Sequence, residues 1–396
     1  MGASPALGTR GAAWLACALG LLAPAAVARA QGAPESWRPA ALGYPSWSTL
    51  EGVDLWGSVG YHRPRASGRL AMAGQVDLTA RITGAGTRVL ALAASVPGLW
   101  PRWRVLAALA SERLQRFPYY GMGNGTGRDE ALLDSVGEGY YRYRLLRSTA
   151  YLAVQRELGG SVRVHAAAQA RHYRVRVPAG PSRLESDLAA GLRPDTGRAD
   201  GVELRAGVVF DTRDFEPVPR RGVWLEAVVG RSVSAPYGRA YTRGLLGARE
   251  FLPVGRAVVA LRQSLEAATD GIPLPVMAER LTTWAPEDHV GGYGTLRASR
   301  TGRWLAPERV VLAAEFRTPV VVRVPGRAKP LTVWVVPFLD AARLWGAGDG
   351  FAVRQLHGGA GIAAVAQFSR GALVAVSVGH STDSPAQVLL GSGFAF

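Results

Sequence analysis

Cysteine is nearly absent from this sequence of 396 residues, which contains a single one. That residue, Cys17, lies inside an N-terminal stretch that we expect to be removed from the mature chain. A disulfide needs two thiols, and thiolate metal sites draw on cysteines at characteristic spacings. The mature protein is therefore expected to contain no disulfide and no thiolate metal site.

Long apolar runs are absent after residue 30, where none approaches the roughly 20 residues that a membrane-spanning helix needs. Yet 48% of the residues are hydrophobic and only 19% are charged. A transmembrane β-barrel explains both observations, because each strand crosses the bilayer with only about 9 to 11 residues of alternating polarity.

Lysine is almost missing too, since Lys329 is the only one and arginine supplies the rest of the positive charge behind a net charge of +16. A nucleic-acid-binding protein would gather such charges in one patch. Here the arginines are spread through alternating strands and turns, so we expect no nucleic-acid partner. Genome composition explains the preference for arginine, and an arginine-rich lumen or a rim facing anionic lipid remains a second explanation.

Motifs of catalytic and metal sites are lacking as well. The six histidines are scattered without an H-E-x-x-H pattern, and no G-x-S-x-G or Walker motif is present. His380, Ser381 and Asp383 are neighbours in one turn, whereas a hydrolase triad converges in space beside an oxyanion hole. We predict no enzyme activity, no metal and no cofactor; an outer-membrane phospholipase, which is also a barrel, is the minor alternative.

The N-terminus has the three parts of a secretory signal peptide over residues 1–30. Arg10 supplies the positive region, an apolar stretch follows, and Ala28-Arg29-Ala30 forms an A-x-A cleavage site. Pro24 interrupts the apolar stretch, which argues against a membrane anchor, and Trp14 disfavours a lipoprotein signal at Cys17. Residues 31–50 are expected to form a short periplasmic segment, too short for a folded domain.

The stretch from Gly201 to Gly230 shows the period of a β-strand twice, on both sides of a turn. Successive strand side chains point to opposite faces, so one parity is apolar and the other is charged. Prolines and a glycine in FEPVPRRG end the first strand and reverse the chain. The stretch therefore predicts a β-hairpin, whose apolar face consists of Val202, Leu204, Ala206, Val208 and Phe210, followed by Val223, Leu225, Ala227 and Val229.

Periodicity alone fits a soluble sandwich as well as a membrane barrel. In this hairpin many apolar positions are alanine and valine, and the polar face combines arginine with acids. An outer-membrane barrel turns such an apolar face to lipid and the charges to a wet lumen. Closure would also remove the edges that a soluble array of strands exposes. We predict an all-β fold, namely an antiparallel transmembrane β-barrel.

Residues 51–396 are expected to form this barrel from about sixteen strands, an even number as in bacterial barrels. The loop at 118–139 contains glycine-rich G-M-G-N-G-T-G, but it follows no buried parallel strand and opens no obvious helix, so it predicts a flexible loop and not a nucleotide site. Later strands are expected near 140–158, 161–177, 223–233, 239–250, 256–269, 279–291, 308–322, 330–344, 353–366, 371–380 and 386–396. Aromatic residues near strand ends suggest girdles at the membrane interfaces: Trp56, Tyr61, Trp100, Trp103, Tyr119, Tyr120, Trp284, Trp304 and Trp345.

Several blocks, in this order along the chain, resemble the barrel domain of the BamA/TamA family of outer-membrane proteins, also called bacterial surface antigens. The blocks are FPYYGMGNGT, FDTRDFEPVPRRGVWLEA, VGGYGTLRASR, AAEFRTPV, VVPFLDAARLW and the final GSGFAF. The resemblance implies a late loop that folds into the lumen, where an arginine at its tip meets acids of the following strands. The matching residues are Arg297, Glu315 and Asp340, with Phe338 on the same parity; Ala298 and Ser299 stand where the family has glycine and an aromatic residue.

The final strand resembles the C-terminal signal by which barrel-assembly machinery recognises its clients. It has Gly391, followed by Phe394 and Phe396 on one face. The resemblance implies that this chain is itself a client of that machinery.

The expected location is the outer membrane of a Gram-negative bacterium, with lipid as the surrounding partner. The resemblance implies protein assembly or translocation, carried out with a periplasmic partner that bears POTRA domains or acts as a chaperone, because the chain has no room for a POTRA domain of its own. A stand-alone pore or a structural surface barrel is the alternative.

Overall fold

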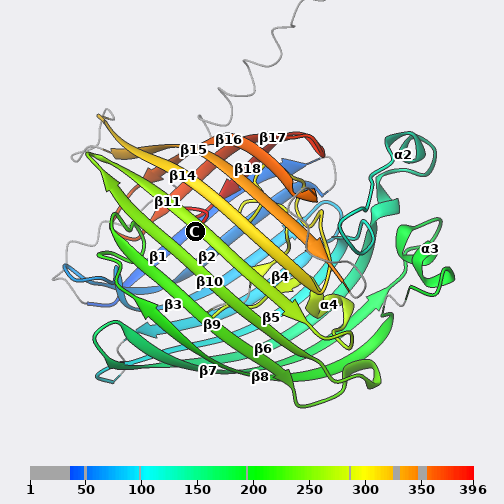
Figure 1. Ribbon diagram of the computed structural model, residues 1–396, viewed down its shortest axis with the longest axis horizontal. Coiled ribbons are helices and arrows are strands. Elements are labelled where there is room, and N and C mark those ends of the chain that lie inside the picture. Colours follow the sequence, from blue (N-terminus) through cyan, green and yellow to red (C-terminus); the bar gives the residue numbers. More distant parts are fainter. Residues whose placement is uncertain are drawn as a thin grey trace, which may run out of the picture.

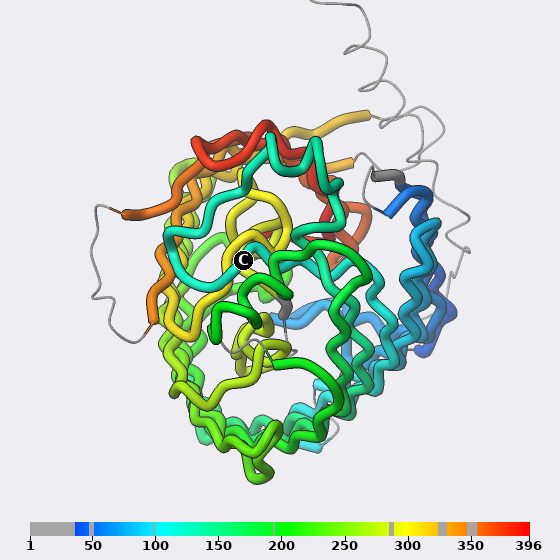
Figure 2. Tube along the Cα trace, turned by 90° about the vertical axis from the view of Figure 1, so that its right-hand side faces the viewer, coloured from blue at the N-terminus to red at the C-terminus, as the bar shows by residue number. Residues whose placement is uncertain are grey.

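Sixteen strands form one antiparallel sheet, in which each strand pairs with the wall strands before and after it in the sequence, from the first strand to the last. The computed structural model describes residues 36–48, 51–97, 100–192, 195–284, 287–323, 331–346 and 355–396, so the expected signal peptide lies outside the described residues. The sheet is wound into a barrel of tilted strands, seen from the side in Figure 1 and as a ring in Figure 2. The predicted antiparallel barrel of about sixteen strands is confirmed.

The wall begins with β1 and ends with β18, and the labels β12 and β13 belong to a separate two-stranded sheet inside the barrel. We call the end with the β5–β6, β7–β8 and β11–β14 connections the long-loop end, and the opposite end the short-turn end. The wall strands are β1 Arg38–Ser48, β2 Gly52–Pro64, β3 Met72–Thr83, β4 Arg88–Pro97, β5 Trp103–Pro118, β6 Arg142–Gly159, β7 Val162–Arg176, β8 Gly197–Asp211, β9 Gly222–Ser232, β10 Thr242–Val254, β11 Ala257–Ala268, β14 Glu308–Val322, β15 Leu331–Trp345, β16 His357–Gln367, β17 Leu373–Ser381 and β18 Ser384–Gly391.

Alternating polarity places apolar side chains outside the wall and charged side chains inside it. In β8 the outward Leu204 and Val208 are about half exposed, whereas the inward Glu203 and Arg205 are buried. β9 pairs with β8 as the sequence predicts for a hairpin. At the turn between them Gly222 has φ of 106°, and a Cβ there would overlap the backbone of Thr212. The predicted hairpin, with its apolar face outward, is confirmed.

The first strand was not expected, because residues 31–50 were assigned to a segment before the barrel. The structure places Arg38–Ser48 in the wall as β1, paired with β2 over its whole length. Two prolines, Pro39 and Pro45, hide the strand pattern, since proline cannot donate to a ladder. An edge strand tolerates them, and β1 is an edge strand.

The strand expected at 279–291 is wrong. Only Glu279–Arg280 (β12) and Glu287–Asp288 (β13) are extended there, and they pair with each other inside the barrel. Adjacent residues Glu279 and Arg280 are both buried, whereas a wall strand would turn one of them outward. One strand gained at the start and one lost here leave the number at sixteen.

The helices of the described residues are short, and none of them is part of the wall. They are α2 Glu130–Val136, α3 Arg183–Ala189 and α4 Leu274–Met277, with single 3₁₀ turns at Glu138–Tyr141 and Pro236–Gly238. α2 lies in the stretch 118–139, where no helix was expected; Asp129 caps it by accepting a hydrogen bond from the Leu132 amide. Within the described residues, no helix has the length and apolar character needed to cross a membrane.

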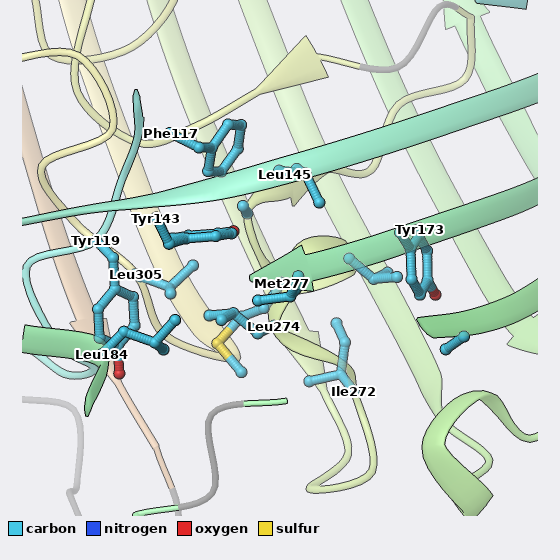
Figure 3. Close-up of a cluster of buried hydrophobic side chains, with 14 of the residues drawn as sticks. Phe117, Tyr119, Tyr143, Leu145, Tyr173, Leu184, Ile272, Leu274, Met277 and Leu305 are labelled. Carbon is cyan, nitrogen blue, oxygen red and sulfur yellow. The ribbon is translucent and has the colours of Figure 1, made fainter. Parts of the chain in front are cut away.

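A hydrophobic cluster fills the lumen toward the long-loop end (Figure 3). Tyr119 belongs to it, and its hydroxyl donates to Asp187 of α3 at 2.7 Å. Burial, together with this hydrogen bond, raises the pKa of Tyr119, so the phenol remains a donor. The cluster joins wall strands to α3 and to the β11–β14 connection through Phe117, Tyr119, Tyr143, Leu145, Tyr173, Leu184, Ile272, Leu274, Met277 and Leu305.

Four of the aromatic residues expected in membrane girdles are therefore interior residues. Tyr119, Tyr120 and Trp304 are almost fully buried, and Trp284 packs partly buried against a cluster of inward-facing residues that includes Tyr151. They belong to loops that cover or enter the lumen, and position near a strand end does not distinguish such loops from the outer rim. Tyr61 and Trp100, in contrast, are about 60% exposed, as a girdle requires.

Candidate functional site

The connection between β11 and β14, residues 269–307, folds into the barrel, and we call it the inward segment. Its described tip turns sharply at Gly291 and Gly292, which have φ near 100°. A Cβ on Gly291 would overlap the carbonyl of Arg300, so glycine allows the two arms of the tip to approach. The tip residues Leu296, Arg297 and Ala298 are each only 1% exposed.

Arg297 connects this tip to two wall strands. Its Nε and Nη2 donate to the two carboxylate oxygens of Asp340 at 2.9 and 2.7 Å, and its Nη1 donates to Glu315. Its guanidinium also lies 3.7 Å from the centre of the Phe338 ring. The structure thus brings together Arg297, Glu315, Asp340 and Phe338, the four residues that the family resemblance and strand parity assigned to this contact; we call them the Arg297 clamp.

Charge balance explains how this clamp tolerates burial. Arg317, on the same strand as Glu315, donates its Nε to the second oxygen of that carboxylate at 2.7 Å. Two arginines and two acids therefore share one buried cluster, in which each carboxylate accepts charge-assisted hydrogen bonds. Removing one member would leave an uncompensated charge, which is strongly destabilising in a buried cluster.

The wall is shaped around the tip at the position where the sequence departs from the family pattern. Ala298 takes the place of a glycine, and its methyl group lies against Gly359 of β16, where any Cβ would overlap it. Gly379 of β17 lies under the Ala298 backbone in the same way. Glycines of the wall therefore provide the space for Ala298 that a glycine in the tip would otherwise provide.

A second set of contacts, which the sequence did not indicate, holds the middle of the inward segment. Glu279 accepts hydrogen bonds from Arg171 at 2.9 Å and from Gln169 at 2.9 Å, and Arg205 lies 3.5 Å away. Arg243 donates to the main-chain oxygen of Glu279 at 3.0 Å. These partners lie 36 to 110 residues away in the sequence, so no local pattern reveals them. The pair of adjacent charges at 279 and 280, which breaks strand alternation, was the available signal.

Further ionic and polar contacts fix the neighbouring residues of the segment. Arg280 donates to Glu266 of β11 at 3.1 Å. Arg309 of β14 donates to the same carboxylate at 2.6 Å and to the main-chain oxygen of Glu279 at 3.0 Å. The hydroxyl of Thr283 donates to Glu226 at 2.6 Å. The inward segment is thus anchored to β9, β11 and β14 in addition to the Arg297 clamp.

The last residues of the sequence leave the wall and enter the lumen. The strand expected over 386–396 ends at Gly391, and Gly393 has φ of 81°, which turns the chain inward. Gly391 lies against the Tyr293 ring of the inward segment, and the Tyr293 hydroxyl donates to the Gly393 oxygen at 2.7 Å. Phe394 and Phe396 therefore do not continue a strand face, and Figure 2 shows this end of the chain inside the ring.

The sheet has two free edges. In the described part of the chain, β1 pairs only with β2 and β18 only with β17. An unpaired strand edge presents a row of amide donors and carbonyl acceptors to an incoming strand. We call the junction between β1 and β18 the seam.

Turns from three parts of the wall meet at the short-turn end. Arg69, in the β2–β3 turn, reaches Asp211 at the end of β8, and Arg104 of β5 binds Glu216 in the β8–β9 turn at 2.8 Å. Arg370 of the β16–β17 turn donates to the carbonyl oxygens of Ala66 and Gly68. The β2–β3 and β16–β17 turns are thereby joined across the seam.

Metal ligation has no support in the described residues, where no group of three or more His, Cys, Asp or Glu side chains could hold an ion. His357 contacts Asp383 at 3.0 Å and stacks on Trp304. His380, Ser381 and Asp383, noted in the sequence as a turn, lie at the β17–β18 connection.

Comparison with solved structures reveals a shared fold at low sequence identity. BamA from Haemophilus ducreyi lacking POTRA domains 1–3 aligns over 91% of this chain and 69% of its own, with 13% identity and a TM-score of 0.55. The chain has the fold of the BamA and CdiB barrels. CdiB from Escherichia coli aligns over 92% of this chain and 63% of its own, with 11% identity and the same TM-score. CdiB from Acinetobacter baumannii aligns over 90% and 58%, with 9% identity and a TM-score of 0.50.

Sequence comparison finds no relative of the chain. No family profile matches the chain, and no curated protein is similar to it in sequence. The structural neighbours are outer-membrane barrel proteins, and the resemblance noted in the sequence is confirmed at the level of the fold.

Proposed function

We propose that this chain is an outer-membrane barrel that assembles or translocates proteins, and that the seam between β1 and β18 is its working site. The observation that carries the proposal is the pair of free strand edges at the seam, together with the departure of residues 392–396 from the wall. A free edge adds an extended segment of another chain as a new strand, with main-chain hydrogen bonds supplying affinity. The BamA-type fold supports this function.

A membrane location is supported by the outer surface of the wall. Large apolar side chains are exposed on strands all around the barrel, for example Leu109 on β5, Leu246 on β10 and Leu339 on β15, each at least 57% exposed. In water such a continuous apolar surface would be unfavourable, whereas lipid matches it. The expected signal peptide supports export to the outer membrane.

The inward segment bears on the alternative of a stand-alone pore. It crosses the lumen and is anchored at the Arg297 clamp and at Glu279. A solute path would require this segment to move. The barrel is therefore better suited to handling strands at its seam than to conducting solutes continuously, and a periplasmic partner with POTRA domains or chaperone activity would deliver them.

A reversible lock across the seam tests this function. Cysteines placed on β1 and β18, for example at Leu42 and Val388, would be joined by thiol cross-linkers of increasing length in a strain that carries only this version. We expect the lock to lower the amount of correctly folded barrels or secreted protein that depends on this chain, and cleavage of the linker to restore it. The sole native cysteine, Cys17, lies in the expected signal peptide, so it should not interfere.

The matched control joins two strands that are already paired. Val378 and Val388 are direct partners in β17 and β18, so a cross-link between cysteines at these positions leaves the seam unchanged. Normal activity with the seam locked, at a level equal to this control, would rule out the seam as the working site.

A further inference from the structure

His357, the first residue of β16, joins three other parts of the chain at the long-loop end. Its Nδ1 lies 3.0 Å from the carboxylate of Asp383, between β17 and β18, and its Nε2 lies 3.0 Å from the main-chain oxygen of Asn124, between β5 and β6. Its ring stacks on Trp304 of the inward segment, with ring centres 3.6 Å apart. We call these four residues the His357 latch.

The two oxygens in this latch can only accept hydrogen bonds. A carboxylate and a peptide carbonyl have no proton to donate, and a neutral imidazole has a proton on one ring nitrogen only. The imidazolium form donates from both nitrogens, so it alone satisfies both contacts of His357. A cation is also attracted to the face of an indole, as the stacking on Trp304 requires. The geometry of the latch is therefore that of a charged histidine.

Deprotonation of His357 would release one of the two contacts, and charge decides which one. The remaining proton stays on Nδ1, because the ionised Asp383 is a stronger acceptor than a neutral carbonyl. The lone pair of Nε2 would then face the oxygen of Asn124 at 3.0 Å, which is repulsive. Loss of the proton therefore separates the β5–β6 connection, residues 119–141, from β16, and the β17–β18 turn stays attached.

Charged groups of the neighbouring elements act on the imidazolium in opposite directions. Asp383 favours it through direct contact. Arg303 of the inward segment stacks on the same indole, and Arg343 of β15 donates to Gln355; both have charge of the same sign as the imidazolium and oppose it. Histidine is the side chain whose charge ordinarily changes between pH 5 and 8. Because the side chain of His357 is 15% exposed, it can exchange its proton with water.

Contacts beside the latch attach the β5–β6 connection to the opposite side of the seam. The Asn124 side chain accepts from the Leu344 amide of β15 at 3.0 Å and donates to the Gln355 oxygen at 2.9 Å. The Gly123 amide donates to the Leu305 oxygen at 2.8 Å. These contacts involve neutral groups only, so they do not change with pH. Figure 2 looks onto this end, with the β5–β6 connection lying across the ring beside the last wall strands.

We propose that His357 is a latch operated by the pH of the medium, which closes the long-loop end of the barrel in acid and releases it in mild alkali. When the ring is protonated, it binds Asp383 and Asn124 together and holds the β5–β6 connection across the lumen. When the ring is neutral, only the uncharged contacts hold the connection, which then opens more often. In outer-membrane barrels the longer loops face the cell exterior, so the medium sets this state.

Labelling of a buried cysteine in the purified full chain in detergent tests the proposal. In a Cys17→Ser background, Ala306→Cys reports opening, since Ala306 is 1% exposed and lies in the cluster of Trp304 and Leu344. Gly125→Cys is the exposed reference, because a Cβ there meets no atom within 4 Å, and it corrects for the pH dependence of the thiol reaction. We expect the ratio of the two labelling rates to rise about tenfold from pH 5 to pH 8, as for loss of one hydrogen bond to a charged group.

Variants assign this pH dependence to the latch. His357→Gln should give the high ratio at both pH values, because its amide does not become charged. Asp383→Asn should move the rise to lower pH, since the carboxylate that favours the imidazolium is gone. The sign follows from linkage, because a histidine with an acidic partner stabilises the closed state at low pH and loses this contribution as the pH rises. His380→Gln is the matched control, because His380 is exposed on the neighbouring β17, and it should leave the pH profile unchanged.

An equal ratio at pH 5 and pH 8 in the wild-type background would overturn the proposal, as would a rise that persists in His357→Gln or an unshifted profile in Asp383→Asn. Heat-modifiability on gels verifies that each variant is folded, and the Asp383 variant decides if the His357 variant is not. The latch is independent of the proposed seam function. Its failure would leave that function open, and loss of that function would leave the latch intact.

Discussion

Arg297 and Asp340 are joined by three hydrogen bonds, two from the guanidinium and one from the Arg297 main-chain nitrogen at 2.9 Å. One carboxylate therefore fixes both the side chain and the backbone of the inward segment's tip. A lysine at position 297 could supply charge but not the planar pair of donors that matches a carboxylate.

Arg297→Ala and Asp340→Ala should each destabilise the tip, because each leaves the opposite charge without its partner in a buried cluster. The cost for a fully buried pair is of order 3 to 5 kcal/mol, and less where water reaches it. We expect faster trypsin cleavage of the inward segment and altered conductance in planar bilayers, with the double variant hardly worse than either single one. Strictly additive effects would mean that the two residues do not act as a pair.

The pair Arg81 and Asp54 is the matched control for this cycle. It is bidentate like the clamp but lies partly exposed on β2 and β3. Exposed pairs contribute about 0.2 to 1 kcal/mol, so its removal should leave cleavage of the inward segment unchanged.

Glu279→Gln should loosen the middle of the inward segment while leaving the Arg297 clamp intact. The amide cannot balance the charges of Arg171 and Arg205, which both approach Glu279. We expect a loss of about 1 to 3 kcal/mol from the buried hydrogen bonds, measured as a shift in urea-induced unfolding, and more frequent channel openings. Glu185→Gln, on the exposed side of α3, serves as control; if the two substitutions behave alike, Glu279 does not anchor the segment.

Phe396→Asp should reduce the amount of heat-modifiable barrel in the outer membrane and increase degradation products in the periplasm. The change removes an aromatic residue from the expected assembly signal and puts a charge against Phe251 and Val258. Ser392→Asp, at an exposed position in the same C-terminal stretch, controls for added charge. Unaltered assembly of the Phe396 variant would show that the last residues are not read as a signal.

Fractionation should recover the mature protein from the outer membrane, with an N-terminus at Gln31. The reason is the A-x-A site at residues 28–30 combined with the lipid-matching outer surface of the barrel. N-terminal sequencing checks the cleavage position, and changing Ala28 and Ala30 to leucine should leave the precursor uncut. Recovery of the mature chain in a soluble fraction would contradict this location.

The wall could be predicted because its physical rule is local. Alternation with a period of two, as in β8 and β9, determines which residues face out, and no knowledge of distant partners is needed. The placement of Arg297 near Asp340 was available from the family resemblance, since the pairing itself spans 43 residues. The contacts of Glu279 could not be predicted in this way, because its partners come from other strands that are far away in the sequence.

The first wall strand and the last residues of the sequence could not be predicted, for a different reason. Pro39 and Pro45 are typical of loops, and a strand tolerates them here only because β1 lies at an edge of the sheet. Phe394 and Phe396 have the spacing of a strand, yet Arg317 and Trp334 offer them an interior site, and tertiary contact overrides the local pattern.

The contact of Arg370 with Ala66 and Gly68 restricts how the two edges can separate. Within the described residues it ties the short-turn end of the seam, so a widening that preserves it is a rotation about that point and not a parallel displacement. The gap would then be a wedge, narrow beside the short turns and widest toward the long loops. An entering strand would meet the β1 edge first at its wide end and extend toward the pivot, so the order in which its residues pair would follow from the position of a single arginine.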